Sequence, residues 1–293
     1  MRRNKRARRK QEVKLHYVHV GSRDKPLMLF LHGFPEFWYS WRHQMREFSN
    51  DYWCVAVDMR GYGESDKPAD ISQYGVKCLS QDVKELVEAL GYSSCVLVAH
   101  DWGGAVAWNT AMYHPEVIDK LIVMNCPHPV VFAQTLSTKP AQLLKSWYMF
   151  FFQVPYLPEL MLKSRDYYVF ETLRSGEMGT TRKDAFTDED IEAWKYVYSQ
   201  PGACTGPLNY YRAAFRDNKK LSEGLKKADK TVDPPTLLIW GTKDPALDES
   251  MAHLTPKHCR DCTLRLVQGA SHWVQHDEPK QCAQFMRDFL HGN

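Results

Sequence analysis

Residues 95–104 read CVLVAHDWGG, a short apolar run that leads into a polar turn rich in glycine. The run is typical of a strand buried in a sheet, and a helix is expected to begin at Ala105. Small residues at Ala99 and Gly103 flank the central Asp101 at the spacing that a tight strand–turn–helix elbow needs. This stretch therefore predicts an α/β fold in which the elbow presents Asp101 at the end of a strand.

Similar apolar runs recur along the chain and predict a mostly parallel sheet. Several are apolar at nearly every position, as expected for strands that are buried on both faces. The segment 76–90, between two of these runs, has apolar residues at helical spacing, and Gly91 follows as a C-terminal cap. The expected strands are residues 15–20, 27–31, 53–57, 95–99, 121–124, 236–240 and 263–267.

The pattern changes after the fifth of these runs. Residues 127–217 are rich in Trp, Tyr, Phe and Met and are expected to form a helical cap. We expect a basic arm at residues 1–12 and an α/β core formed by residues 13–126 and 218–293. An insertion of this kind usually lies over the carboxyl ends of the strands, where open sheets bind ligands.

Positive charge is concentrated at the N-terminus. Residues 1–10 hold seven Lys or Arg and no acid, so the net charge is +3 while the rest of the chain is slightly acidic. A nucleic-acid-binding face is therefore not indicated. The basic arm is consistent with contact to anionic lipid at a membrane surface, a nuclear signal, the remnant of an anchor, or a solvated tail.

The sequence also bears on the compartment. It has no apolar run long enough for a transmembrane helix, and no apolar core of a signal peptide near its start. The eight cysteines are scattered, and Cys259 and Cys262 form a lone C-x-x-C pair. We expect a reduced intracellular protein, cytosolic or associated with the endoplasmic reticulum membrane, without a metal or cofactor. No pattern indicates its oligomeric state.

The acidic residue at the elbow limits the chemistry. A carboxylate that attacks a saturated carbon forms an alkyl ester, which water can then cleave. His272 follows the last expected strand and Asp244 follows the strand before it, in the chain order nucleophile, acid, histidine. We expect Asp244 to orient His272, which activates water for the attack on the ester of Asp101. The backbone N–H groups of Phe34 and Trp102 are expected to hold the oxyanion.

Five motifs together carry a family resemblance. They are HGFPEFWYSWR at 32–42, DMRGYGESDKP at 58–68, AHDWGG at 99–104, WGTKD at 240–244 and ASHW at 270–273. In this order they resemble the epoxide hydrolases of the α/β-hydrolase fold, and most of all the animal group of epoxide hydrolases 3 and 4. The resemblance implies an enzyme that converts a small-molecule epoxide to a vicinal diol through an ester on Asp101.

The same resemblance implies roles for the cap. The family uses two cap tyrosines to hold the epoxide oxygen, and the matching positions are Tyr148 and Tyr211, with Tyr210 as the neighbour most easily confused with them. Phenol donors stabilise the alkoxide that develops as the ring opens. A lipophilic pocket, suited to lipid or fatty-acid epoxides, is expected from four cap residues. They are Trp147, Met149, Phe151 and Phe152.

Two alternatives stay open. A haloalkane or haloacid dehalogenase uses the same carboxylate and histidine chemistry, but it needs donors for a halide rather than phenols. A non-enzymatic ligand-binding protein on this fold needs no complete catalytic set. The chain departs from the family pattern at its start, because relatives have a further strand before residues 15–20, where this chain has the basic arm.

Overall fold

The central sheet has seven strands in the part of the chain that the structure describes. The structure is a computed structural model that describes residues 13–174, 176–225 and 231–292, so the basic arm expected at residues 1–12 lies outside the described residues. In the order β1-β3-β2-β4-β5-β6-β7, β1 is antiparallel to β3 and every other pair is parallel. The strands are β1 (Tyr17–Val20), β2 (Leu27–Leu31), β3 (Trp53–Val57), β4 (Cys95–His100), β5 (Ile118–Met124), β6 (Thr236–Gly241) and β7 (Cys262–Val267).

Helices cover both faces of the sheet. Alternate residues of a strand point to opposite faces, so Leu29 of β2 belongs to the apolar cluster under α2 and α3, and Phe30 belongs to the cluster under α1 and α12. Burial on both sides explains why the strands are apolar at successive positions. The expected α/β fold with a mostly parallel sheet is thereby confirmed. The helices of the core are α1 (Arg42–Phe48), α2 (Val76–Ala89), α3 (Asp101–Tyr113), α10 (Ser250–Leu254), α11 (Val274–Asp277) and α12 (Pro279–His291).

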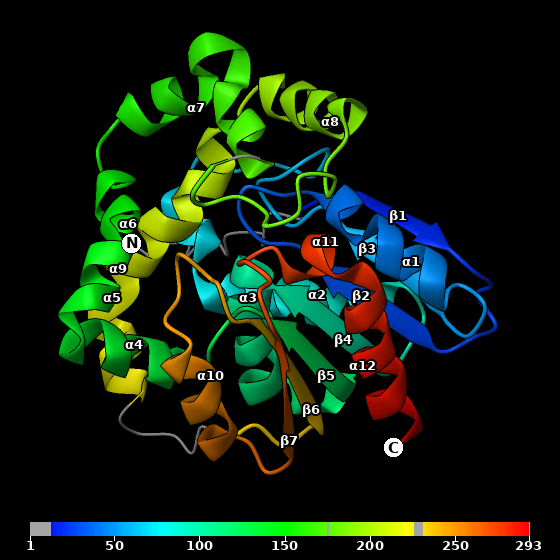
Figure 1. The fold of residues 1–293 in the computed structure, drawn as a ribbon. Helices are drawn as coiled ribbons and strands as arrows, with labels where there is room; N and C mark the ends of the chain where they lie inside the picture. Colours follow the sequence, from blue (N-terminus) through cyan, green and yellow to red (C-terminus); the bar gives the residue numbers. More distant parts are fainter. Residues whose placement is uncertain (1–12, 175, 226–230, 293) are drawn as a thin grey trace, which may run out of the picture.

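A helical cap is inserted between β5 and β6 and lies to one side of the sheet (Figure 1). Phe37 and Trp273 of the core pack with cap side chains in a third apolar cluster. The last cap helix, α9, runs through residue 217, where the end of the insertion was expected, and ends at Leu225. No helix in the described residues is long and apolar enough to span a bilayer. The cap helices are α4 (Pro129–Thr138), α5 (Pro140–Lys145), α6 (Trp147–Phe151), α7 (Leu157–Tyr167), α8 (Asp188–Ser199) and α9 (Thr205–Leu225).

The register of the parallel strands brings their carboxyl ends to one edge of the sheet. Leu31 is paired with Ala99, Ala99 with Val123, and Met124 with Ile239. The loops that follow β2, β4, β5 and β6 therefore start beside one another. The cap packs against residues of these loops, so the edge that binds ligands in open sheets is the edge that the cap covers.

Candidate active site

Asp101 stands at a strained elbow between β4 and α3. Its φ of 48° lies in the left-handed region, which costs a non-glycine residue on the order of 1 kcal/mol. The turn is possible because neighbouring backbone comes very close. A Cβ at Gly33 would lie 2.5 Å from the Cβ of Asp101, and a Cβ at Gly103 would clash with the carbonyl oxygen of Leu31. The glycines thus let the elbow press Asp101 against the loop after β2.

The two carboxylate oxygens of Asp101 face different partners. The backbone N–H of Phe34 donates to Oδ1 at 2.8 Å, and Nε2 of His272 lies 3.5 Å from Oδ2. The next residue, Trp102, is in the first turn of α3, where backbone N–H groups have no acceptor within the helix. The structure thus brings the expected nucleophile, its histidine and both expected oxyanion donors together.

The imidazole of His272 is held from behind by a buried carboxylate. Nδ1 of His272 lies 2.7 Å from Oδ2 of Asp244, and the backbone N–H groups of Ala246 and Leu247 donate to the other oxygen at 2.8 and 2.9 Å. The side-chain amide of Asn125 donates to Oδ2 at 2.8 Å. Because four contacts fix this carboxylate, it also fixes the orientation of the imidazole. The position of Nε2, the ring nitrogen that faces Asp101, is fixed as a result.

Burial and charge set the protonation states of this cluster. Burial acts against the imidazolium, but the carboxylates of Asp244 and Asp101 raise the pKa of His272 well above its ordinary value. Burial likewise opposes the ionised form of Asp244, yet His272 and the amide of Asn125 hold the pKa of that carboxyl below its ordinary value. In the free protein the two carboxylates on either side of His272 therefore favour the protonated form of its imidazole.

The two expected tyrosines meet above the elbow. Tyr148 in α6 and Tyr211 in α9 have ring centroids 6.0 Å apart, and the ring of Tyr211 packs edge-on against Phe34 and Trp102 at 5.2 and 5.0 Å. Burial and the nearby charge of Asp101 raise the pKa of both phenols. Both are therefore protonated at neutral pH and can donate a hydrogen bond, and both lie close enough to Asp101 for its charge to affect their pKa.

Tyr210 has a different role from its neighbour. Its hydroxyl donates to the backbone oxygen of Arg60 at 2.7 Å, and its ring is buried against the rings of Tyr62 and Tyr74. This side chain fastens α9 to the core. The structure thus separates Tyr210 from Tyr211, the residue to which the family resemblance points.

The residues expected to line a lipophilic pocket divide between the inside and the outside of the cap. Met149 and Phe152 are buried, and the ring of Phe152 lies 4.9 Å from that of Tyr211. Phe151 is partly buried beside Phe152. Trp147, by contrast, is 61% exposed, which places it on the outer surface of the cap rather than in this buried group. The reason is helical: Trp147 and Phe150, which are both exposed, share one side of the short helix α6, away from Met149.

A buried polar network lies beneath the elbow. Glu36 accepts a hydrogen bond from the N–H of Gly33 at 2.7 Å, and it pairs with His100 at 2.7 Å and His276 at 3.3 Å. Burial opposes its ionisation, but the two histidines hold the pKa of Glu36 well below its ordinary value. His100 also contacts the backbone carbonyl of His272 at 2.9 Å. Glu36 therefore ties the loop after β2 to β4 and to the loop that carries His272.

Asn125 is a site residue that sequence reasoning missed. It follows β5 directly, and besides contacting Asp244 it accepts a hydrogen bond from the N–H of Gly241 at 2.9 Å. Its place in the sequence is a signal that could have identified it, because Asn125 follows an apolar run closely, as Asp101 and Asp244 do. Asn125 was passed over because an amide does not titrate.

Asp277 is a second missed residue, and it joins the cap to the histidine loop. One oxygen of this fully buried carboxylate accepts from the backbone N–H and the hydroxyl of Ser271, at 2.7 and 2.6 Å. The other accepts from the N–H groups of Thr181 and Arg182 in the cap, at 2.8 and 3.1 Å. Since Ser271 precedes His272, the position of the cap and the position of His272 are linked through one side chain.

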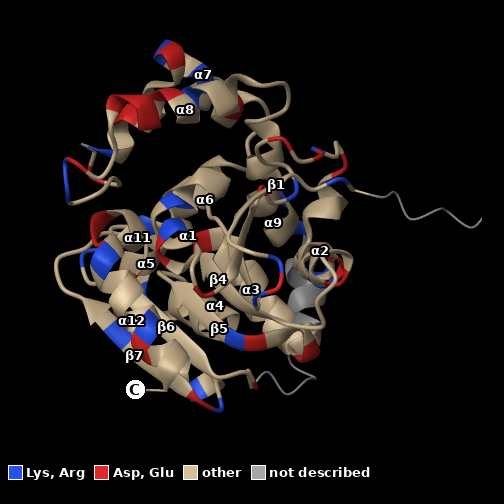
Figure 2. Ribbon diagram, turned by 90° about the vertical axis from the view of Figure 1, so that its right-hand side faces the viewer, with Lys and Arg blue, Asp and Glu red and all other residues tan. Residues whose placement is uncertain are grey.

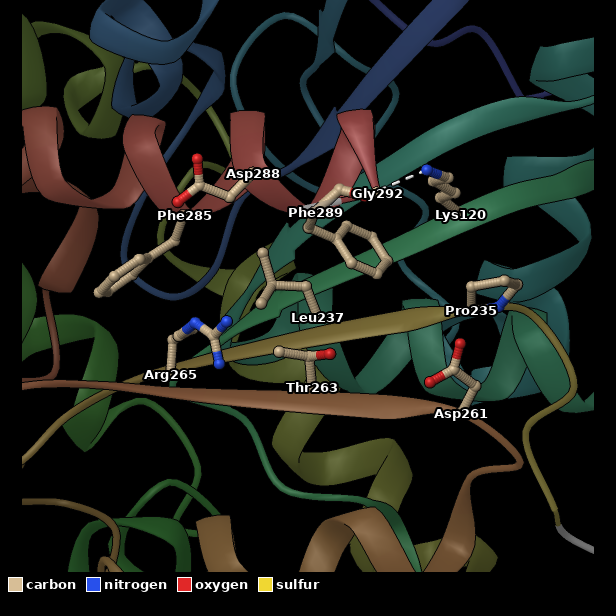
Figure 3. A pocket seen from close by; sticks show the side chains of 10 residues that line it. All are labelled: Lys120, Pro235, Leu237, Asp261, Thr263, Arg265, Phe285, Asp288, Phe289 and Gly292. Carbon is tan, nitrogen blue, oxygen red and sulfur yellow. Dashed lines mark hydrogen bonds between the residues drawn. The ribbon is translucent and has the colours of Figure 1, made fainter.

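Two surface pockets of about 370 Å³ each lie outside this cluster. One lies at the amino ends of β5, β6 and β7, where Lys120, Leu237 and Thr263 line it together with Phe289 of α12 (Figure 3). It is thus at the opposite end of the strands from Asp101. The other lies between α1 and the cap segment that precedes α8. Neither pocket contains a residue of the Asp101, His272 and Asp244 group.

Comparisons with known proteins agree with this geometry. A family model described as alpha/beta hydrolase fold matches residues 26–279. Epoxide hydrolase 1 of Caenorhabditis elegans is 46% identical over 96% of this chain and 68% of its own length. Human epoxide hydrolase 4 is 47% identical over 95% of this chain and 76% of its own length. The crystal structure of Bacillus megaterium epoxide hydrolase in complex with an inhibitor has a TM-score of 0.83 and 33% identity, over 95% of this chain and 97% of that one.

The fold, with a nucleophile elbow under a helical cap, defines an α/β hydrolase. Within that fold, the chain belongs to the epoxide hydrolase family. The resemblance inferred from the five sequence motifs is thereby confirmed.

We expect Asp277→Ala to lower the free energy of unfolding by about 3 kcal/mol or more, because four donors would lose a buried acceptor. Turnover should fall as well, since Ser271 and the adjacent His272 lose an anchor. Denaturant unfolding and steady-state kinetics would measure both effects. The matched control is Asp184→Ala, an exposed carboxylate paired with Arg182, which should change stability by less than about 0.5 kcal/mol. Wild-type stability in Asp277→Ala would contradict the assigned link.

Proposed function

We propose that this protein hydrolyses epoxides to vicinal diols through an alkyl ester on Asp101. The observation that carries the proposal is the placement of one carboxylate near both a histidine backed by Asp244 and two phenols, of which Tyr211 is buried and Tyr148 partly buried. Relatives named as epoxide hydrolases support the reaction type.

The first step consumes the charge of the nucleophile. An oxygen of Asp101 attacks a ring carbon, the bond from that carbon to the ring oxygen breaks, and the ring oxygen takes a proton from Tyr148 or Tyr211. The charge of Asp101 helps to raise the pKa of both phenols. When the ester forms this contribution ends, so the phenols become stronger acids at the stage when the ring oxygen needs a proton.

The second step needs a neutral imidazole. Ester formation removes the Asp101 charge that helps to keep His272 protonated, which favours transfer of its proton to solvent; the imidazole takes a proton back from solvent once Asp101 is ionised again. His272 then takes a proton from water as the water oxygen attacks the ester carbonyl, and the N–H groups of Phe34 and Trp102 face the oxyanion. The bond to the diol oxygen breaks, and the imidazolium returns its proton to that oxygen. The second proton of the water restores the tyrosine.

The substrate class follows from the surroundings of the phenols. The side chains near Tyr211 are Phe34, Trp102 and Phe152, with Met149 buried in the same apolar cluster. Such walls favour an apolar ligand that has one polar group, the epoxide oxygen, at the two phenols. We therefore propose a small lipophilic epoxide, of the lipid or fatty-acid kind, as the substrate.

The ester should accumulate when its hydrolysis is blocked. His272→Gln removes the base for the second step and leaves Asp101 able to attack, so intact-protein mass spectrometry should show an adduct equal to the mass of the epoxide, on the peptide that holds Asp101. Asp101→Asn should show no adduct. His253→Gln, at an exposed histidine of α10, should turn over normally. Diol production by His272→Gln at the wild-type rate, with no adduct, would contradict the proposal.

The tyrosine pair should act on ester formation. Phe at Tyr148 or Tyr211 removes one donor to a developing alkoxide, which typically costs about 10²–10³ in rate. The matched control is Tyr210→Phe, which loses a structural hydrogen bond worth about 1 kcal/mol but leaves ester formation unchanged. Stopped-flow measurement of ester formation on one lipid epoxide would test this. A double variant that forms the ester at nearly the wild-type rate and releases halide from a chloroalkane would favour the dehalogenase alternative.

The pKa of His272 should differ between the free protein and the ester. In the free protein two carboxylates raise it, whereas in the ester Asp101 is neutral and the pKa should be lower. The rate of ester hydrolysis should therefore rise with pH, because only neutral His272 is a base. The pKa of this rise should be lower than the pKa of His272 in the free protein. Single-turnover kinetics give the pKa of His272 in the ester, and NMR titration of labelled histidine gives its pKa in the free protein. Equal values would show that Asp101 does not influence the imidazole.

A further inference from the structure

The outer side of the cap exposes an unusual concentration of large apolar side chains. In the described residues thirteen large hydrophobic side chains are exposed, and eight of these fall between residues 143 and 160. We call this set the outer cap face. Scattered exposed leucines are ordinary on a soluble protein, but a contiguous apolar patch marks a binding surface. The face consists of Leu143, Leu144, Trp147, Phe150, Val154, Tyr156, Leu157 and Leu160.

The spacing of these residues places them on one side of consecutive helices. Trp147 and Phe150 in α6 are three residues apart, as are Leu157 and Leu160 in α7, which is the spacing of one helix face. Figure 1 shows α5, α6 and α7 following one another along the outer edge of the cap, with α9 on their inner side. The exposed residues therefore lie on three consecutive helices and on the segment between α6 and α7, while Met149 of α6 is buried.

A single arginine of α9 holds this surface in shape. The guanidinium of Arg212 donates to the backbone oxygens of Phe152 and Val154 at 3.0 and 3.3 Å, and to the carboxylate of Glu159 at 2.7 and 3.0 Å. These bonds join the end of α6 to the start of α7. The outer cap face is thus built on a fixed turn, so little ordering remains to be done when it meets a partner.

The charges around the face favour an anionic, apolar partner. Lys139, which pairs with Asp248, precedes the face, Lys145 lies within it, and Lys163 and Arg165 follow it. The acids of residues 139–166 are Glu159, which is tied to Arg212, and Asp166. Lys163 and Arg165 are exposed. The acids of the cap lie instead on neighbouring elements such as α8, at the top of Figure 2. A surface of Leu, Trp, Tyr and Phe flanked by basic side chains is typical of segments that lie at the boundary between lipid headgroups and acyl chains.

From this exposure, spacing and charge we propose that the outer cap face docks on the surface of a lipid bilayer. Trp147, Phe150 and the leucines would lie at the headgroup boundary, and Lys163 and Arg165 would meet lipid phosphates. The other side of α6 carries Tyr148, so one helix separates the bilayer from the proposed site. This inference goes beyond the proposed function and does not depend on it, because docking requires no turnover.

Flotation of the full-length protein with vesicles would test the proposal. On vesicles of equal parts phosphatidylcholine and phosphatidylserine, Leu144→Ser/Leu160→Ser should weaken binding about tenfold or more, because it removes two apolar side chains from the contact. The basic arm is identical in both proteins, so the difference reports on the cap. The matched control is Tyr196→Ser, at a residue 69% exposed on α8, which should bind like the wild type. Unchanged thermal unfolding would show that all variants are folded.

Several outcomes would overturn the proposal. The first is a wild-type protein that does not float with vesicles, and the second is a double variant that binds as tightly as the wild type. The third is binding that high salt abolishes, because that would assign it to the basic arm alone. The fourth is a dimer, seen by sedimentation velocity, that Leu144→Ser/Leu160→Ser dissociates, because the face would then belong to a second copy of the chain. Diol formation is not measured, so each of these results leaves the proposed function untouched.

Discussion

The close approach of Gly33 to Asp101 is the contact on which the rest of the site depends. No side chain fits between the loop after β2 and the elbow, so the N–H of Phe34 comes within 2.8 Å of the carboxylate. The same contact fixes which oxygen faces the backbone donor and which faces His272. A residue with a Cβ at Gly33 would push the loop away and separate the two halves of the site, although the sheet below would be unchanged.

Buried carboxylates hold the loops of this site, each in a different way. Glu36 joins the loop after β2 to β4, Asp244 orients His272, and Asp277 joins the loop of His272 to the cap. A carboxylate can accept several hydrogen bonds at once, so it can fix loops that share no regular secondary structure. The site consists mostly of loops at strand ends, which lack the backbone hydrogen bonds of a sheet. The hydrogen bonds accepted by these carboxylates hold the loops in position instead.

The sequence located residues that follow apolar strands and failed where partners come from far along the chain. Asp101, Asp244 and His272 stand just after such runs, and parallel strands end at one edge, so their meeting could be predicted. Asp277 could not, because its partners Thr181 and Arg182 belong to the cap. Residues 147–152 are apolar or aromatic throughout, and such a run has no polar side to show which residues face inward. Hence Trp147 was grouped with Phe152, although the two face opposite ways.

The place of the insertion also has a consequence for folding. β5 and β6 are neighbours in the sheet, yet the chain between them, from Met124 to Thr236, includes the whole cap. The entropy lost on closing a loop grows only slowly, by about 0.6 kcal/mol for each doubling of its length. Pairings between distant segments nevertheless form slowly. Lengthening the cap would therefore delay completion of the sheet far more than it would weaken it, which leaves the cap free to diverge while the core stays the same.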